Sequence, residues 1–134
     1  MTDALKSRAH RVLIVDDEPS VRKATQLVLA RAGFDARMAP TVVDAVQLSR
    51  DWPPDLILLD LAMPLMHGMD GVGLFKAEPA TRDALIVAHT GYVSPEDTDM
   101  LGPLGFGGFI LKPADPGELP RQLAAMLAAR SRSD

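Results

Sequence analysis

The sequence contains no cysteine. Disulfide bonds and thiolate metal sites are therefore excluded, and the composition fits a reducing cytoplasm. Aromatic residues make up only 4% of the chain. The apolar runs are too short to span a bilayer, and residues 1–10 lack the apolar segment of a signal peptide. We therefore expect neither a membrane span nor a secretory leader.

The chain also lacks an excess of positive charge. It has 14 lysines and arginines against 18 acidic residues, a formal net charge of -4. Nonspecific nucleic-acid binding normally rests on a basic surface, so we expect no nucleic-acid partner. The 134 residues suffice for one domain. A domain of this length buries roughly two-thirds of its unfolded surface and needs no structural metal to fold.

Five short apolar runs recur along the chain and predict five strands. Because they are continuous and bounded by turn residues, they are typical of strands buried on both faces of a parallel sheet. The second is the least apolar and the fifth contains two glycines, so both are expected at the edges. The five runs are 11–15, 34–39, 55–59, 84–89 and 106–111.

Segments with helical periodicity follow the first two strands. The first helix is expected between Pro19 and Gly33, because proline suits the start of a helix and glycine its end. Its inward stripe is predicted to contain Val21, Ala24, Val28 and Ala32. Thr41 is the expected cap of the second helix. The inward face of that helix is predicted to contain Val42, Ala45 and Val46.

Three more helices are predicted in the second half of the chain. One follows Gly68, with Leu74 and Phe75 facing inward. The next has Ser94 as its cap and Pro95 as its first residue, and it should be short because Gly102 and Pro103 stop it. The last is expected to begin at Asp115-Pro116, with Leu119, Leu123, Met126 and Leu127 inward. Five βα units with short connections indicate an α/β three-layer sandwich with right-handed crossovers.

Polar residues lie at the carboxyl ends of four of the predicted strands. Asp16 and Asp17 follow the first strand, Asp60 the third, Thr90 the fourth and Lys112 the fifth. In open α/β sheets, ligands bind at these ends, where the strand order reverses. Three carboxylates brought together repel one another unless a cation lies among them, and such hard oxygen ligands suit Mg²⁺.

The remaining polar residues of this edge also suit phosphate chemistry. Lys112 would supply a positive charge, and Thr90 a hydroxyl donor, to a transferred phosphoryl group. Two histidines lie nearby in the sequence. We interpret His67 as a solvent-exposed loop residue, and His89 as a partly buried, hydrogen-bonded residue that points away from the site.

The sequence resembles the receiver domains of two-component response regulators over roughly residues 10–130. The resemblance rests on residues 15–23, 55–71 and 105–113 and on the Thr90-Gly91 pair. It implies a flavodoxin-like, doubly wound parallel sheet of five strands in the order 2-1-3-4-5, with five helices. Residues 1–9 and 131–134 are expected to be flexible ends outside the receiver domain.

The resemblance also implies residue roles. Asp60 would be the phosphoacceptor, forming an aspartyl phosphate. Asp17, Asp60 and the backbone carbonyl of Ala62 would bind Mg²⁺, with Asp16 assisting directly or through water. Thr90 and Lys112 would hold the phosphoryl oxygens.

Further positions match the family's switching and tuning residues. Thr90 and Phe109 would form the switch that responds to phosphorylation. Ala62 and Tyr92 would tune the lifetime of the phosphoryl group. Neither side chain is suited to hold a water molecule in line for attack on the aspartyl phosphate, so we hypothesise a long-lived phosphoryl group. The peptide bond between Lys112 and Pro113 is expected to be cis, as in the family.

The implied function is that of a stand-alone, chemotaxis-regulator-like response regulator in the cytoplasm. It would be a signalling switch rather than an enzyme, although it would catalyse its own phosphorylation and dephosphorylation. A histidine kinase or a histidine phosphotransfer protein would be the phosphoryl donor. A protein target would bind the face made by the fourth helix, fifth strand and fifth helix. We expect no membrane partner, and a monomer or weak dimer.

Several alternatives remain at this point. The chain could act as a free-standing regulator, as a relay in a phosphotransfer chain, or as a receiver cut from a hybrid sensor kinase. An aspartate-nucleophile phosphatase is disfavoured because Asp60-Leu61-Ala62 lacks a second acid. A flavodoxin-like cofactor carrier is disfavoured because residues 16–18 are acidic and would repel phosphate. A docking module that is never phosphorylated is disfavoured because the residue set is complete.

Overall fold

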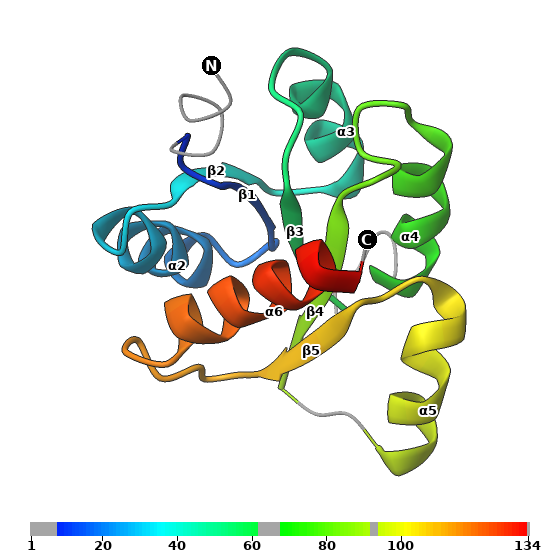
Figure 1. The fold of residues 1–134 in the computed structure, drawn as a ribbon. Helices are drawn as coiled ribbons and strands as arrows, with labels where there is room; N and C mark the ends of the chain where they lie inside the picture. Colours follow the sequence, from blue (N-terminus) through cyan, green and yellow to red (C-terminus); the bar gives the residue numbers. More distant parts are fainter. Residues whose placement is uncertain (1–7, 62–67, 92–93, 134) are drawn as a thin grey trace.

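The structure is a computed structural model, and it describes residues 8–61, 68–91 and 94–133. Strands and helices alternate along these residues (Figure 1). The strands are β1 (Arg11–Val15), β2 (Asp35–Ala39), β3 (Leu56–Asp60), β4 (Leu85–Thr90) and β5 (Gly108–Leu111). The helices are α2 (Pro19–Arg31), α3 (Val42–Asp51), α4 (Gly68–Ala77), α5 (Pro95–Leu104) and α6 (Leu119–Ser133).

The five strands form one parallel sheet in the order β2-β1-β3-β4-β5. This order confirms the predicted doubly wound architecture, including β2 and β5 at the edges. The strand positions agree with the predicted runs to within one or two residues. Asp60 and Thr90, however, are the last residues of β3 and β4 rather than the residues that follow them.

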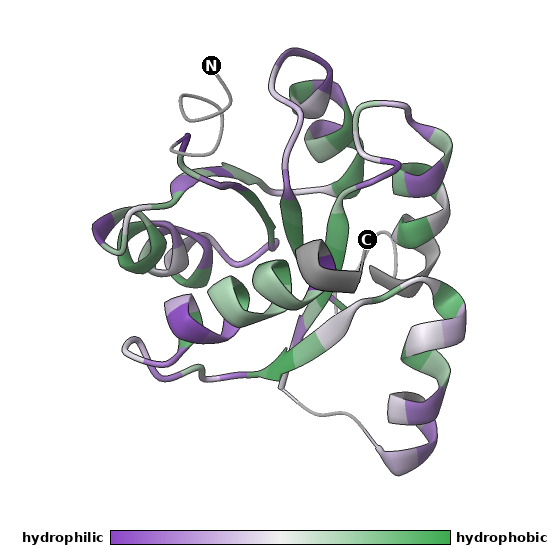
Figure 2. Ribbon diagram, viewed as in Figure 1, coloured by the Kyte–Doolittle hydropathy of each residue, from purple (hydrophilic) through white to green (hydrophobic). Residues whose placement is uncertain are grey.

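Helices cover both faces of the sheet, with α2 and α6 on one face and α3, α4 and α5 on the other (Figure 1). Each layer has its own apolar core. Phe75 of α4 lies in one core and Leu123 of α6 in the other, and both side chains are fully buried. The central strands are the most hydrophobic elements, whereas the helices alternate hydrophobic and hydrophilic residues (Figure 2). This pattern is what burial of the sheet between two helical layers requires.

The inward face of α2 differs from the predicted stripe. Its buried residues are Thr25 and Leu29, whereas Ala24 is exposed and Val21 and Val28 are only partly buried. The prediction followed the small apolar residues, but Leu29 is the side chain that reaches the core. Thr25 can be buried because its hydroxyl donates a hydrogen bond of 2.7 Å to the carbonyl of Val21. The predicted end of the helix at Gly33 is confirmed, with φ at 99°.

The predicted faces of α3 and α4 are partly confirmed. Thr41 caps α3, because its side chain accepts a hydrogen bond from the backbone N–H of Asp44. In α4, Phe75 is buried as predicted, but Leu74 is exposed, so its predicted inward position is wrong. Adjacent helical residues lie about 100° apart around the axis, so a helix that buries Phe75 turns Leu74 toward solvent.

The ends of α5 and α6 also differ from the predictions. The helix α5 begins at Pro95 as predicted, but it continues through Pro103 and ends at Leu104. Its stop is Gly105, whose φ is 112° and whose N–H donates to the carbonyl of Gly102. The helix α6 begins at Leu119, later than predicted, because the Asp115 carboxylate first accepts hydrogen bonds from the N–H groups of residues 117 and 118 in a turn.

Among the described residues, no helix is both long and apolar enough to cross a bilayer.

Substitution of Gly105, which follows α5, tests how that helix ends, and Gly73 within α4 serves as the control. Gly105 adopts a left-handed backbone conformation, and a Cβ atom there would lie 3.0 Å from Val72. Gly73 is at an exposed position of helix α4, and a Cβ atom there would meet nothing within 4 Å. We expect Gly105→Ala to lower the free energy of unfolding by about 1 kcal/mol or more. Gly73→Ala should raise it by about 0.5–1 kcal/mol, as measured by urea denaturation. Equal effects of the two substitutions would contradict this account of the α5 end.

Candidate functional site

The carboxyl edge of the sheet brings together the polar residues that follow or end four strands. Asp16 and Asp17 follow β1, Asp60 ends β3, Thr90 ends β4, and Lys112 follows β5. Because all five strands run parallel, these ends lie on the same edge. The edge includes the ends of the paired strands β1 and β3, between which the order of the strands reverses.

Three aspartates form a cluster at this edge. Carboxylate oxygens of Asp16, Asp17 and Asp60 all lie within 4.8 Å of one another. Asp16 and Asp60 are buried, with exposed fractions of 1% and 5%, whereas Asp17 is exposed. Like charges at this distance repel, and burial of two of them weakens the screening by water. The cluster therefore requires positive charge nearby.

Lys112, which directly follows the edge strand β5, supplies that charge. Its ammonium group lies 2.7 Å from a carboxylate oxygen of Asp16 and 3.6 Å from one of Asp60. Its backbone N–H donates a hydrogen bond of 2.7 Å to the carbonyl of Thr90, which holds the end of β5 against β4. The bond between Lys112 and Pro113 is cis, as predicted.

Two groups that the sequence analysis did not single out hold Asp16 in place. The backbone N–H of Glu18 donates to the Asp16 carboxylate at 3.0 Å, and the Arg22 guanidinium donates to the Asp16 carbonyl at 2.8 Å. Glu18 precedes the first residue of α2, so this contact orients the loop at the start of the helix. Arg22 could have been noticed, because a cation in the first turn of a helix opposes the helix dipole and needs another partner.

Thr90 and Phe109 lie in the two strands next to this cluster. Thr90 is buried at the end of β4, and Phe109 of β5 is half-buried against the core that α3, α4 and α5 cover. The structure therefore brings together Asp16, Asp17, Asp60 and Lys112, with Thr90 on the adjacent strand end. Three predicted residues, Ala62, Tyr92 and His67, lie outside the described residues.

His89 is buried, but it is not hydrogen-bonded as predicted. Only 4% of the residue is exposed, and its Nε2 atom has no hydrogen-bond partner within the described part of the chain. Residues alternate sides along a strand, so His89 shares its face of β4 with Val87, which packs in the core beneath α2 and α6. The pKa of His89 is lowered from 6.5 to about 4, chiefly by burial and also by the positive charge of Lys112, with the negative charge of Asp16 opposing the shift.

The donor set of the aspartate cluster fits a hard divalent cation. It consists of carboxylate oxygens only, and one of the three side chains is exposed to solvent. Such a site can bind Mg²⁺ through one or two carboxylates while the ion keeps several waters.

Comparison with known proteins identifies the family to which this chain belongs. The model of the response regulator receiver domain family matches residues 12–124. The chain belongs to the response regulator receiver domain family. Receiver domains are signalling switches of two-component systems, and the strand order and the helices of this chain are those of the family's flavodoxin-like fold.

Two curated relatives illustrate the family. The phosphate regulon transcriptional regulatory protein PhoB of Klebsiella pneumoniae is 37% identical over 120 residues, which cover 89% of this chain and 52% of PhoB. An uncharacterised 14.6 kDa protein of Leptolyngbya boryana is 33% identical over 110 residues, which cover 82% of this chain and 84% of that protein. The receiver domain thus spans about half the length of PhoB and most of the length of the other relative.

The fold is also that of a solved structure. The chemotaxis protein CheY4 of Vibrio cholerae superposes with a TM-score of 0.83 at 27% sequence identity, covering 89% of this chain and 99% of CheY4. This likeness confirms the predicted resemblance to chemotaxis regulators at the level of the fold.

The lowered pKa of His89 predicts that the folded protein loses stability in acid. The unfolded chain gains a proton on this histidine below its ordinary pKa of 6.5, whereas the folded chain does not until about pH 4. The stability contributed by the neutral ring is therefore complete above pH 6.5 and is lost as the pH falls toward 4. Between pH 7.5 and 4.5, we expect the wild type to lose on the order of 2 kcal/mol more unfolding free energy than His89→Leu. Urea denaturation at both pH values measures this, and parallel losses would contradict it.

Proposed function

We propose that this receiver domain is switched by phosphorylation of Asp60. The observation that favours Asp60 is its position at the end of β3, where it is buried within the aspartate cluster and faces the ammonium group of Lys112 at 3.6 Å. A nucleophile held there meets both the cation-binding acids and a fixed positive charge. The chain belongs to the receiver domain family, whose members are signalling switches, so phosphorylation of Asp60 would act as a signal.

The neighbouring residues suit the oxygens of a phosphoryl group. Lys112 offers ammonium donors, and Thr90 offers a hydroxyl group at the adjacent strand end. Asp17, Asp60 and the Ala62 carbonyl would hold Mg²⁺, with Asp16 assisting directly or through water. When bound, Mg²⁺ would neutralise charge on the carboxylates and on the phosphoryl oxygens.

The phosphoryl transfer is a single displacement. A carboxylate oxygen of Asp60 forms a bond to phosphorus while the phosphorus–nitrogen bond of a donor phosphohistidine breaks. The electron pair of that bond remains on the imidazole of the donor, and Lys112 stabilises the negative charge on the phosphoryl oxygens. The donor would be a histidine kinase or a histidine phosphotransfer protein. The domain catalyses this step on itself and acts as a switch.

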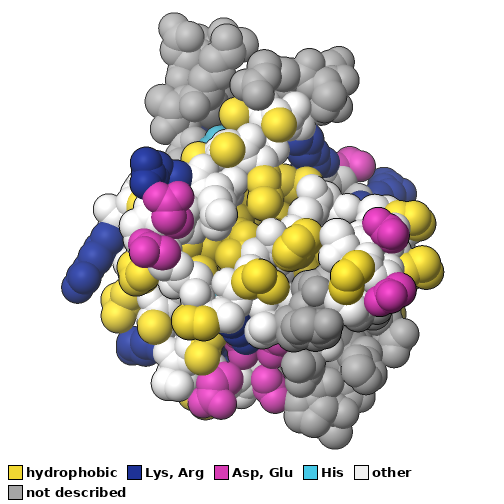
Figure 3. All heavy atoms as spheres, turned by 90° about the horizontal axis from the view of Figure 1, so that it is seen from below, with side chains coloured by type: hydrophobic (Ala, Val, Ile, Leu, Met, Phe, Trp, Pro, Cys, Tyr) yellow, Lys and Arg dark blue, Asp and Glu magenta, His cyan; other side chains and the backbone are white. Residues whose placement is uncertain are grey.

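The output would be a change in the face made by α5, β5 and α6. Thr90 would move toward the phosphoryl group, and the half-buried Phe109 would turn inward, which shifts the population of two arrangements of this face. Large apolar side chains are already exposed there: Met100 and Leu104 of α5, and Leu111 of β5. In the view from below, hydrophobic side chains gather near the middle of the surface and charged ones lie toward its edge (Figure 3). An apolar face of this kind suits a protein target.

Compartment, oligomeric state and phosphoryl lifetime complete this proposal. We place the domain in the cytoplasm, because a chain without cysteine suits a reducing compartment. We expect a monomer or weak dimer, and we expect the aspartyl phosphate to be long-lived through Ala62 and Tyr92.

Intact mass after incubation with acetyl phosphate tests the phosphoacceptor. We expect a gain of one phosphoryl group that requires Mg²⁺ and is absent in Asp60→Asn. The matched control is Asp35→Asn, which removes an exposed carboxylate at the start of β2, at the opposite edge of the sheet from the cluster, and should leave the gain intact. A gain that persists in Asp60→Asn would overturn the assignment. The absence of any gain in the wild type would favour a docking module that is never phosphorylated.

Thermal denaturation with and without Mg²⁺ tests the cation site separately. An ion that binds only the folded chain stabilises it by about 2.7 kcal/mol when its concentration is 100 times the Kd. We therefore expect Mg²⁺ to raise the melting temperature of the wild type and of Asp35→Asn. The rise should be much smaller in Asp17→Asn, which removes the exposed member of the cluster. An equal rise in all three proteins would show that the ion binds elsewhere.

A further inference from the structure

The loop between β1 and α2 carries two of the three clustered acids. Asp16 and Asp17 belong to no strand or helix, so the regular hydrogen bonds of the sheet and of α2 do not fix the peptide group between them. Asp16 is buried, whereas Asp17 is exposed. The direction of the exposed carboxylate therefore depends on whatever else holds the backbone before it.

Each polar group of Asp16 has a partner. Its N–H donates to the Ala39 carbonyl at 3.3 Å, and its carboxylate accepts from the Glu18 N–H at 3.0 Å and from the Lys112 ammonium group at 2.7 Å. Its carbonyl accepts from the Arg22 guanidinium at 2.8 Å. Of these contacts, only the one from Arg22 falls on the peptide group that joins Asp16 to the next residue.

Arg22 holds this loop at two points. Its guanidinium donates to the Asp16 carbonyl, and its own N–H donates to the Glu18 carbonyl at 2.9 Å. The Arg22 side chain is only partly exposed, and the carboxylate of Asp16 pairs with Lys112 rather than with this guanidinium. Arg22 therefore acts on the backbone of the loop and leaves the carboxylates to other partners.

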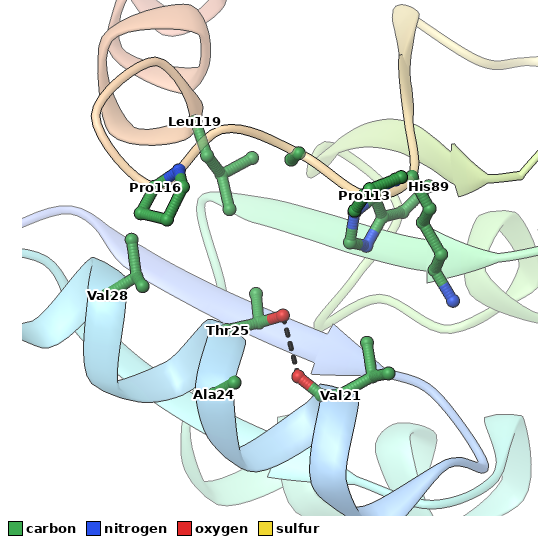
Figure 4. Close-up of a pocket in the computed structure, with 10 residues that line it drawn as sticks. Val21, Ala24, Thr25, Val28, His89, Pro113, Pro116 and Leu119 are labelled. Carbon is green, nitrogen blue, oxygen red and sulfur yellow. Dashed lines mark hydrogen bonds between the residues drawn. The ribbon is translucent and has the colours of Figure 1, made fainter.

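The helix α2 gives the guanidinium group a fixed base. Leu29 of α2 is fully buried, and Thr25 is buried as well. Val21 and Thr25 point toward Pro113 across a cavity, and the Thr25 hydroxyl donates to the Val21 carbonyl (Figure 4). This side of the helix thus faces the domain. Arg22 follows Val21 and is turned about 100° from it around the helix axis, which directs its side chain to the loop.

A contact to the Asp16 carbonyl also restrains Asp17. The atoms of one peptide bond lie in a plane, so fixing this carbonyl fixes the N–H and the Cα atom of Asp17. Asp17 is the exposed member of the cluster, yet its carboxylate lies within 4.8 Å of those of Asp16 and Asp60. An exposed side chain has the most freedom to turn away, and a fixed backbone reduces the entropy that is lost when a cation binds.

We propose that Arg22 is a positioning residue for the cation site: it holds the peptide group between Asp16 and Asp17 and so keeps the Asp17 carboxylate directed at the cluster. This role rests on the proposed function, in which the aspartate cluster binds Mg²⁺. In this role, Arg22 touches neither the cation nor the phosphoryl group. Removal of a group that orients a metal ligand typically lowers metal affinity by roughly 10- to 100-fold.

The charge of Arg22 makes the role testable, because charge and positioning predict opposite results. A positive group near a cation site repels the cation, so charge alone predicts that Mg²⁺ binds Arg22→Gln more tightly than the wild type. Loss of the hydrogen bond to the Asp16 carbonyl predicts weaker binding instead. We expect the weaker binding, with a Kd raised on the order of tenfold.

Mg²⁺ titrations of the whole chain, followed by ¹H–¹⁵N NMR, measure the Kd. Arg22→Lys keeps the charge and a donor, so it should bind Mg²⁺ more tightly than Arg22→Gln, whereas charge alone predicts the reverse. The matched control is Lys23→Gln, which removes the same charge from the next, exposed residue of α2. Its Kd should be nearly that of the wild type, because water and salt screen exposed charges.

Two further measurements separate positioning from a general loss of structure. In the metal-free protein, the ¹⁵N order parameter of the Asp17 amide should fall in Arg22→Gln and stay at the wild-type value in Lys23→Gln. With acetyl phosphate, Arg22→Gln should need more Mg²⁺ for its half-maximal phosphorylation rate and should approach the wild-type rate when Mg²⁺ is saturating. Thermal denaturation shows whether each variant is folded.

The results separate this role from the proposed function. Equal or tighter Mg²⁺ binding by a folded Arg22→Gln, or an unchanged order parameter at Asp17, would overturn the positioning role and leave the cation site intact. A wild type that binds no Mg²⁺ would overturn the cation site itself, together with this role. Weaker binding in Lys23→Gln to the same extent as in Arg22→Gln would also overturn the role, since the loss would then follow the charge of the helix.

Discussion

The ion pairs of Lys112 are the interaction on which the functional edge of this domain depends. One ammonium group contacts Asp16 at 2.7 Å and Asp60 at 3.6 Å, so it joins the segment after β5 to acids at the ends of β1 and β3. Two of the three clustered carboxylates are buried, and without this charge their repulsion would act in a poorly screened environment. The same repulsion leaves the cluster in need of further positive charge, and that need makes it suitable for a divalent cation.

Parallel strand pairing makes this contact possible. Lys112 lies 96 residues from Asp16 in the sequence, yet both residues follow strands of one sheet. Backbone hydrogen bonds hold both partners of the ion pair in place: Lys112 N–H donates to the Thr90 carbonyl, and Glu18 N–H donates to the Asp16 carboxylate. A charged side chain held by its backbone and its partners loses little entropy when a ligand arrives, which is what preorganisation of a reactive site means.

The two helical layers have different roles around this edge. The layer of α3, α4 and α5 packs against Phe109 and leaves Met100 and Leu104 exposed, which suits an output face. The layer of α2 and α6 instead encloses His89 and a cavity. His89 Nε2 finds no hydrogen-bond partner among the described residues, and a buried polar atom that gives up its hydrogen bonds to water without replacing them lowers stability.

Much of the fold and site followed from the sequence alone, because hydrophobic runs of strand length and polar residues at their ends are local signals. The runs predicted all five strands, and the motifs around Asp60, Thr90 and Lys112 predicted which residues would meet. Local patterns did not reveal how the helices pack: Leu29 rather than Ala24 faces the core, Leu74 is exposed, and α5 continues through Pro103 until Gly105. Nor did they reveal the hydrogen bond from Arg22 to the Asp16 carbonyl, or that His89 Nε2 has no hydrogen-bond partner among the described residues. These features were decided by tertiary structure, because burial and hydrogen bonding depend on which surfaces distant segments present to one another, whereas strand length, turn chemistry and charge are properties of the chain itself.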